Sequence, residues 1–190
     1  MVVRLDEADT FASLVRVLRD GAVAVIPCDT IYGLVGVAPS TEARISRIKR
    51  RDPSKPLLRL VASESWLGRY STMALPPALR PFWPGPLTIV FPAIGGGTVA
   101  LRVPADAWLR DVLAAVDLPL VSTSVNREGD PPLGRIAEIV SRFEREVDLV
   151  VDGGDRVDAS PSTVVDATAR PYRVIRQGAV RLPENLTERA

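Results

Sequence analysis

Apolar residues along the chain follow two spacings, one typical of helices and one typical of buried strands. From Phe11 to Leu18 they recur every three or four residues between an acidic start and Gly21, so we predict an amphipathic helix over residues 9–20. The continuous apolar run at 22–26 that follows predicts a buried strand.

The same two patterns alternate through the rest of the chain. The segment CDTIYGL at 28–34 is interpreted as a polar turn and GGG at 95–97 as a hairpin turn. Strands separated by helices indicate an α/β fold, and hairpin-like pairs indicate a mixed sheet, so we expect a twisted open sheet with helices packed on it. We predict a helix that starts near residue 40 and ends near the basic run at 49–55, helices over 108–113 and 136–143, and strands at 57–62, 87–91, 98–103, 119–124, 148–151, 162–167 and 172–176.

Composition fits a single globular domain over residues 1–190. The chain is 46% hydrophobic, and its 24 basic and 23 acidic residues leave a net charge of +1, which provides no overall attraction to nucleic acid or membrane. The first residues are acidic and no apolar stretch approaches about 20 residues, so we expect a soluble, cytoplasmic protein.

Several enzyme classes are excluded by the residues that the chain lacks. It contains one cysteine, Cys28, and no histidine, so it has neither an internal disulfide, a Cys/His zinc site nor a Ser-His dyad. It also lacks the GxxxxGK[ST] loop and a GxGxxG sequence after a strand, the two common nucleotide-binding fingerprints.

Several of the predicted strands end in short polar clusters: CDT at 28–30, STS at 122–124 and SPST at 160–163. In open α/β sheets, ligands tend to bind beyond strand ends, where hydroxyl and backbone N–H groups converge. Alternatively, these serines and threonines are ordinary turn residues that bond to their own backbone. The residues alone leave both readings open.

Positive charge is concentrated in the segment that runs from KRR at 49–51 to Lys55, which has the amount of positive charge that a triphosphate requires. A solvated helix end, favoured by the helix dipole, is the alternative. Arg102 lies inside the apolar pattern ALRVP and Arg176 inside YRVIRQG. Each either faces solvent or binds an anion, because an unpaired charge is costly to bury.

Taken together, these segments resemble the YrdC-like family of threonylcarbamoyl-AMP synthases over about residues 10–182. The resemblance rests on an ordered set of motifs, which is more specific than any one of them. The motifs are PCDTIYGL (27–34), KRR (49–51) with KPL (55–57), FWPGPLT (82–88), TVALRVP (98–104), STSVN (122–126), PSTVVD (161–166) and IRQGAV (175–180).

The resemblance implies a YrdC-like α/β fold, a twisted mixed sheet with a concave ligand-binding face, and a nucleotidyltransferase that makes threonylcarbamoyl-AMP and pyrophosphate from L-threonine, bicarbonate and ATP. The implied threonine-binding residues are Thr30, Arg102, Ser124 and Ser162, with Arg102 pairing the amino-acid carboxylate. The implied ATP-binding residues are Lys49, Arg51, Lys55, Thr98, Ser122, Asn126 and Arg176.

In the implied reaction, threonine's amine takes up carbon dioxide derived from bicarbonate, and an oxygen of the resulting carbamate attacks the α-phosphorus of ATP as pyrophosphate leaves. Because no histidine is available, we infer that catalysis rests on orientation and on cations that neutralise the leaving pyrophosphate, with Lys49 and Arg51 as candidates. Mg²⁺ is expected to be held mainly by ATP, with no dedicated protein ligands.

By the same resemblance, the product passes to a separate complex that transfers threonylcarbamoyl to adenosine in tRNA, and no additional C-terminal domain is expected. The chain departs from the family pattern at Cys28, Val35, Arg50 and Val125, and in a shorter 33–49 connection. Two alternatives remain, a module that binds tRNA or double-stranded RNA and a nucleotide-binding paralogue without synthase activity.

Overall fold

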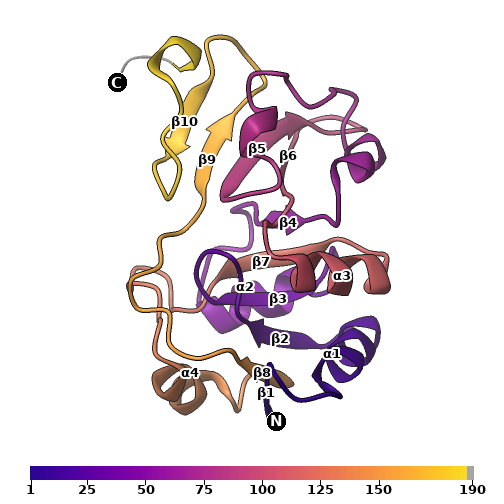
Figure 1. The fold of residues 1–190 in the computed structure, drawn as a ribbon, viewed down its shortest axis with the longest axis vertical. Helices are drawn as coiled ribbons and strands as arrows, with labels where there is room; N and C mark the ends of the chain where they lie inside the picture. The colour runs from indigo at the N-terminus through magenta and orange to yellow at the C-terminus, as the bar shows by residue number, and fades with distance from the viewer. Residues whose placement is uncertain (188–190) are drawn as a thin grey trace.

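A computed structural model describes residues 1–187, which contain one mixed ten-stranded sheet and four α-helices (Figure 1). Along the sheet the order is β1-β8-β2-β3-β7-β4-β6-β5-β9-β10, with parallel and antiparallel neighbours. The strands are β1 Val2–Arg4, β2 Val23–Ile26, β3 Gly33–Val37, β4 Leu58–Leu60, β5 Leu87–Pro92, β6 Thr98–Arg102, β7 Leu120–Ser124, β8 Leu149–Asp152, β9 Thr163–Asp166 and β10 Arg173–Arg176. The helices are α1 Thr10–Arg19, α2 Glu42–Lys49, α3 Ala107–Val116 and α4 Ile136–Phe143, with short 3-10 helices at Glu64–Arg69, Arg80–Phe82 and Glu184–Leu186. The α/β fold and the mixed sheet are therefore confirmed.

Helices cover both faces of one half of the sheet, the half that holds β1, β2, β3, β7 and β8 (Figure 1). Ala24 and Ile26 of β2 pack into the core that contains the apolar sides of α1 and α3. Val23 and Val25, which point the other way, belong to the core that contains α2 and α4. A strand buried on both faces is continuously apolar, which explains why the run at 22–26 was readable from the sequence.

The other half of the sheet is covered differently. Ile89 and Leu101, paired across β5 and β6, lie in the same core as Trp83. Their neighbours Val90 and Ala100, paired with one another, point to the opposite face and are only partly buried. Because side chains alternate along a strand, this half of the sheet has one covered face and one face open to a ligand.

The hairpin prediction is confirmed, because the three glycines at 95–97 all have positive φ angles and connect the antiparallel strands β5 and β6. The polar-turn interpretation of 28–34 was wrong at its end, since β3 begins at Gly33 and lies centrally between β2 and β7. Gly33 and Gly36 lie in this strand, and glycine is more typical of turns than of strands. Gly36 is required there because an added Cβ would lie 2.5 Å from Oγ1 of Thr41.

Two short strands differ from the sequence prediction. The three-residue strand β1 pairs in parallel with β8, its partner almost 150 residues later, and is too short to show a periodicity. The strand expected at 57–62 is reduced to Leu58–Leu60. None of the helices within residues 1–187 has the length and apolar character needed to cross a membrane.

Candidate functional site

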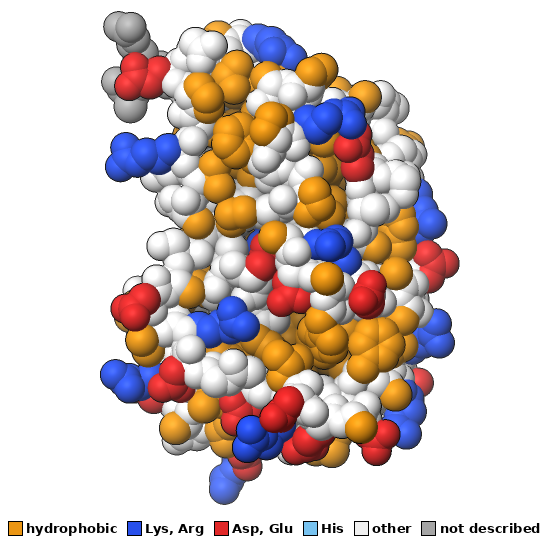
Figure 2. All heavy atoms as spheres, in the orientation of Figure 1, with side chains coloured by type: hydrophobic (Ala, Val, Ile, Leu, Met, Phe, Trp, Pro, Cys, Tyr) orange, Lys and Arg blue, Asp and Glu red, His pale blue; other side chains and the backbone are white. Residues whose placement is uncertain are grey.

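A cavity of about 640 Å³ opens on the uncovered face of the sheet. Its floor includes Val90, Ala100 and Val164 from β5, β6 and β9, and hydroxyl and charged side chains surround this apolar floor. Figure 2 shows the molecule hollowed on the side between β10 above and α4 below. The size lies within the range of about 300–1,000 Å³ that is usual for small-molecule sites.

Ten of the eleven residues predicted to bind threonine or ATP line this one cavity. They come from the CDT turn, the end of α2 and the loop after it, β6, β7 with its following loop, and the chain around β9 and β10. Thr98 is set apart from them: it lies exposed at the start of β6, two residues before Ala100. The residues brought together are Thr30, Lys49, Arg51, Lys55, Arg102, Ser122, Ser124, Asn126, Ser162 and Arg176.

Arg102 is 3% exposed and forms a buried ion pair with Asp29 of the CDT turn. Its Nη1 donates to Oδ1 of Asp29 at 3.0 Å, and the other carboxylate oxygen accepts from the backbone N–H of Ala105 at 2.8 Å. Nε of Arg102 is buried and has no hydrogen-bond partner among residues 1–187. Arg102 therefore does not face solvent, because it is buried and pairs with Asp29, a functional candidate that the sequence reasoning missed.

Arg176 provides a second guanidinium near Arg102. Its Nη2 donates to the carbonyl oxygen of Ser162 at 2.7 Å and to its hydroxyl at 3.2 Å. The pairing register of β10 with β9 shifts between Val174 and Arg176, as at a β-bulge, and both Ile175 and Arg176 line the cavity. Burial lowers the pKa of Arg176, and the nearby positive charge of Arg102 lowers it further, as expected for two cations that lie close together.

The hydroxyl of Ser162 also lies 2.8 Å from the hydroxyl of Thr88, and both side chains are buried. Thr88 is a lining residue that was not predicted. Thr88 is the last residue of the motif FWPGPLT, but a single threonine inside a predicted strand does not by itself indicate a binding residue.

Lys49 ends α2 and inserts its ammonium beneath the loop that follows β7. Nζ donates to the carbonyl oxygens of Ser124 and Asn126 at 2.7 and 3.1 Å and to Oδ1 of Asn126 at 2.7 Å. Burial, with a smaller effect of Arg51, lowers the pKa of Lys49 to about 8. The three donors of this ammonium are occupied, so Lys49 joins two segments of the site and adds a positive charge to it.

The loop after α2 carries the remaining cations. Lys55 donates to Glu128 at 2.7 Å, which ties this loop to the one after β7. Arg51 donates to the carbonyl of Pro56 at 3.3 Å, while its buried Nε has no partner within residues 1–187. Arg50, between the two predicted phosphate ligands, ends the helix in a left-handed conformation with φ of 52°.

Uncharged side chains, Cys28 and Tyr32, line the cavity beside and within the CDTIYGL segment. Burial raises the pKa of the Cys28 thiol to about 11, so it stays protonated near neutral pH and is not a nucleophile. The Tyr32 hydroxyl accepts from the N–H of Gly153 at 2.9 Å and donates to the carbonyl of Gly154 at 2.8 Å. Tyr32 therefore joins the turn to the segment that leads from β8 toward β9.

Positive charge dominates the cavity lining. Five cationic side chains line it, whereas Glu128 is the one carboxylate in the lining formed by the described residues. Within residues 1–187, no three Cys, Asp or Glu side chains are grouped so that they could hold a metal ion. The arrangement suits an anionic ligand, and a divalent cation here would need oxygen ligands supplied by that ligand.

Comparisons with known proteins identify relatives of this chain. The Sua5/YciO/YrdC family model, described as "Telomere recombination", matches residues 16–178. A protein of Chromohalobacter salexigens named threonylcarbamoyl-AMP synthase is 33% identical over 177 residues, which cover 85% of this chain and 94% of that protein. A Pyrococcus abyssi protein of the same name is 31% identical over 181 residues, but these cover 88% of this chain and only 53% of the Pyrococcus protein.

A solved structure gives the same picture at the level of the fold. The crystal structure of Pyrococcus abyssi Sua5 complexed with L-threonine has a TM-score of 0.84 to this chain at 26% identity, covering 94% of this chain and 57% of Sua5. The chain thus spans about half the length of the Pyrococcus protein. The match to the family model over most of the chain, together with relatives above 30% identity, shows that the chain belongs to the Sua5/YciO/YrdC family.

Proposed function

We propose that this chain is a threonylcarbamoyl-AMP synthase, which makes threonylcarbamoyl-AMP and pyrophosphate from L-threonine, bicarbonate and ATP. The observation that carries the proposal is the convergence of five cations and a set of hydroxyl groups, from distant parts of the chain, in the cavity of about 640 Å³. The names of the similar Chromohalobacter and Pyrococcus proteins, and the threonine bound by Pyrococcus Sua5, support it.

Threonine is proposed to bind at the end of the cavity that holds Arg102. The buried Nε of Arg102 is a donor without an acceptor among residues 1–187, and a carboxylate would supply that acceptor. Thr30, Ser124 and Ser162 place hydroxyl groups around the same cavity for the polar groups of the amino acid. Discrimination by hydrogen bonding to the threonine hydroxyl predicts poor use of valine and weaker discrimination against serine.

The phosphates of ATP are proposed to meet the loop after α2. Arg51 and Lys55 have donors available toward a ligand, since one makes a single long hydrogen bond and the other a half-exposed ion pair. Lys49 contributes charge while its hydrogen bonds hold Asn126 in place. Mg²⁺ would be carried by the phosphates, because Glu128, the one carboxylate in the part of the lining that the structure describes, is already paired with Lys55.

The reaction needs little acid–base help from the protein under this proposal. The nucleophile is the carbamate that threonine forms with carbon dioxide, and the charge that develops on the departing pyrophosphate is what the protein must stabilise. Preorganised cations such as Arg51 do this without having to reorganise during the reaction. The labile product would then pass to a tRNA threonylcarbamoyl-transferase complex, and the protein would work in the cytoplasm.

The test is pyrophosphate release by the purified chain with ATP, Mg²⁺ and bicarbonate, with and without L-threonine. We expect release that depends on both threonine and bicarbonate, and a loss of about 10- to 1000-fold in Arg51→Ala, by analogy with removal of one preorganised donor. Arg59→Ala is the matched control, because Arg59 pairs with Glu42 and does not line the cavity. Release that is indifferent to threonine would instead favour a nucleotide-binding paralogue.

A further inference from the structure

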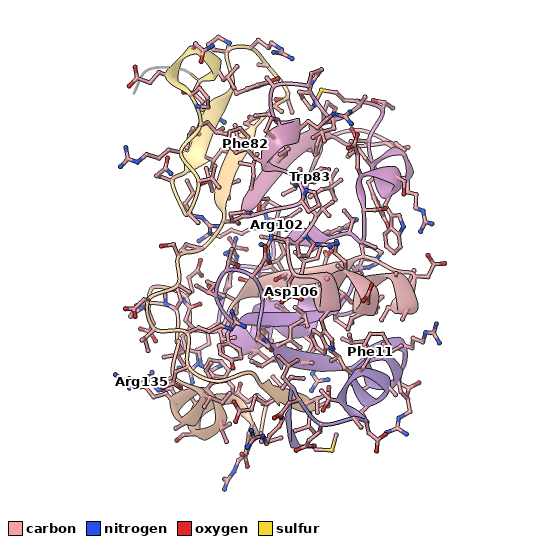
Figure 3. All side chains as sticks on the ribbon, in the orientation of Figure 1. Phe11, Phe82, Trp83, Arg102, Asp106 and Arg135 are labelled. Carbon is pink, nitrogen blue, oxygen red and sulfur yellow. The ribbon has the colours of Figure 1, made fainter. Side chains whose placement is uncertain are left out.

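Asp29 touches the proposed threonine site without lining the cavity. It lies in the CDT turn between β2 and β3, its side chain is 10% exposed, and its partner Arg102 is 73 residues away in the sequence. Figure 3 places Arg102 where the upper half of the sheet meets the half that carries α3, just above Asp106. Asp29 therefore links the turn of one half to the last residue of β6, whose strand belongs to the other half.

The way in which Asp29 binds Arg102 determines which part of the guanidinium remains free. Asp29 accepts from Nη1 with one oxygen, and its other oxygen accepts from the N–H of Ala105, so both oxygens are engaged away from the Nε–Nη2 edge. Within residues 1–187, Nε has no partner, and Nη2 makes no hydrogen bond either. Nε and Nη2 form one edge of the planar guanidinium, and two parallel donors on one edge are the arrangement that binds a carboxylate with both oxygens.

The charges around Arg102 favour a singly charged ligand. Arg176, which the family resemblance implied as an ATP ligand, interacts with Ser162 and lies near Arg102, so it is counted here with the amino-acid end. Arg102 and Arg176 carry two positive charges and Asp29 one negative charge, so this end of the cavity has one net positive charge, which a carboxylate neutralises. At the other end, Lys49, Arg51 and Lys55 outnumber Glu128 by two charges. A polyphosphate is therefore better matched there than beside Arg102.

We propose that Asp29 is a positioning residue that reserves the Nε–Nη2 edge of Arg102 for the carboxylate of the amino-acid substrate and disfavours phosphate at this end of the cavity. The inference rests on the proposed function, because it assigns the amino-acid end and the phosphate end of that same site. Asp29 acts through Arg102 and contacts no substrate itself. Under this proposal the carboxylate of Asp29 orients the Arg102 guanidinium and also offsets its charge. Separate variants of Asp29 can distinguish these two properties.

The test compares Asp29→Asn, which keeps the shape and removes the charge, with Asp29→Glu, which keeps the charge. L-Threonine binding is measured by calorimetric titration, and the KM values for threonine and ATP by pyrophosphate release. Misplacing one reacting group costs up to about 100-fold, so we expect threonine to bind Asp29→Asn about 10- to 100-fold more weakly. The KM for ATP should stay within about threefold, because the phosphate end is untouched, and Asp29→Glu should recover at least part of the threonine affinity.

Inorganic phosphate supplies a readout that a merely structural role would not change. Losing the negative charge should strengthen phosphate inhibition competitive with threonine by about tenfold in Asp29→Asn, since charge complementarity sets which anion is preferred. Asp106→Asn is the matched control, because it removes a nearby carboxylate that caps α3 through the N–H of Leu109 instead of binding Arg102. That variant should behave like the wild type in both measurements.

The outcomes separate this inference from the proposed function. Unchanged threonine affinity and unchanged phosphate inhibition in Asp29→Asn, with or without a lower thermal midpoint, would overturn the role of Asp29. A wild-type chain that binds threonine but releases no pyrophosphate would overturn the synthase function, while the binding comparison would still decide the role of Asp29. A wild-type chain that fails to bind threonine would overturn both.

Discussion

Replacing Lys49 by methionine should both destabilise the protein and disable the site. The substitution keeps an unbranched side chain of similar length but removes the ammonium that donates to Ser124 and Asn126. Three carbonyl oxygens lose a donor in a region where Lys49 itself is 3% exposed. The loop that carries the predicted ligand Asn126 would then be free to move.

The magnitude follows from two opposing effects. Hydrogen bonds to a charged group contribute about 1.5–3 kcal/mol each, so three contribute roughly 5–9 kcal/mol. Against them, lowering the pKa of Lys49 from 10.5 to about 8 corresponds to an unfavourable ~3 kcal/mol for keeping the ammonium buried. The hydrogen bonds therefore exceed the cost of burial, and we expect Lys49→Met to lower the free energy of unfolding by roughly 2–6 kcal/mol.

Urea denaturation of Lys49→Met and Arg51→Ala, combined with pyrophosphate release, tests this reasoning. Arg51 makes one long hydrogen bond, to Pro56, so its loss should reduce the rate while the urea midpoint stays close to that of the wild type. A Lys49→Met variant that is as stable as the wild type but inactive would refute the positioning role and restore direct contact with phosphate. Full activity in that variant would refute any role of Lys49 in the site.

Three further predictions address local features of the fold and the site. Arg50→Gly should raise the free energy of unfolding by about 0.5–1 kcal/mol in urea denaturation, because glycine adopts the left-handed conformation without strain; a lower value would show that the Arg50 side chain is stabilising. Gly36→Ala should destabilise by about 1–3 kcal/mol, since its Cβ would clash with Thr41, whereas Gly68→Ala, with nothing within 4 Å, should be nearly neutral; equal effects would contradict the packing argument. Deprotonation of Lys49 above about pH 8 removes one of its N–H donors and its charge, so the rate of pyrophosphate release should fall there. Lys49→Arg stays protonated, so it should not show this decline, even if its overall rate is lower.

The order of most elements could be predicted from the sequence because the relevant information is local, whereas the residues proposed for the site came from the ordered family motifs. Apolar runs that are buried on both faces, such as 22–26, reveal themselves by composition alone. The polar clusters at 28–30, 122–124 and 160–163 were readable because each stands next to a strand, and the sheet then brings these places together around one cavity.

Features that depend on partners distant in sequence could be decided only by the tertiary structure. The glycines of β3 suggest a turn in the sequence, and only the folded chain shows that Thr41 packs against Gly36. Thr98 is the first residue of the motif TVALRVP, yet it does not line the cavity. The partner of Arg102 is likewise a residue that no local pattern connects to it.

The sequence by itself determined the α/β class, the family motifs and the concentration of cations that could meet an anion. The sequence did not show which of these cations have hydrogen-bond donors available for an anion, because the orientation of a charged side chain depends on acceptors that folding places beside it. Lys49 and Arg51 are neighbours in one motif, but the structure directs the first into the loop after β7 and leaves Nε of the second without a partner within residues 1–187. That difference arises because the end of α2 lies beside the end of β7, where Ser124 accepts from Lys49, and only the folded chain brings these two ends together.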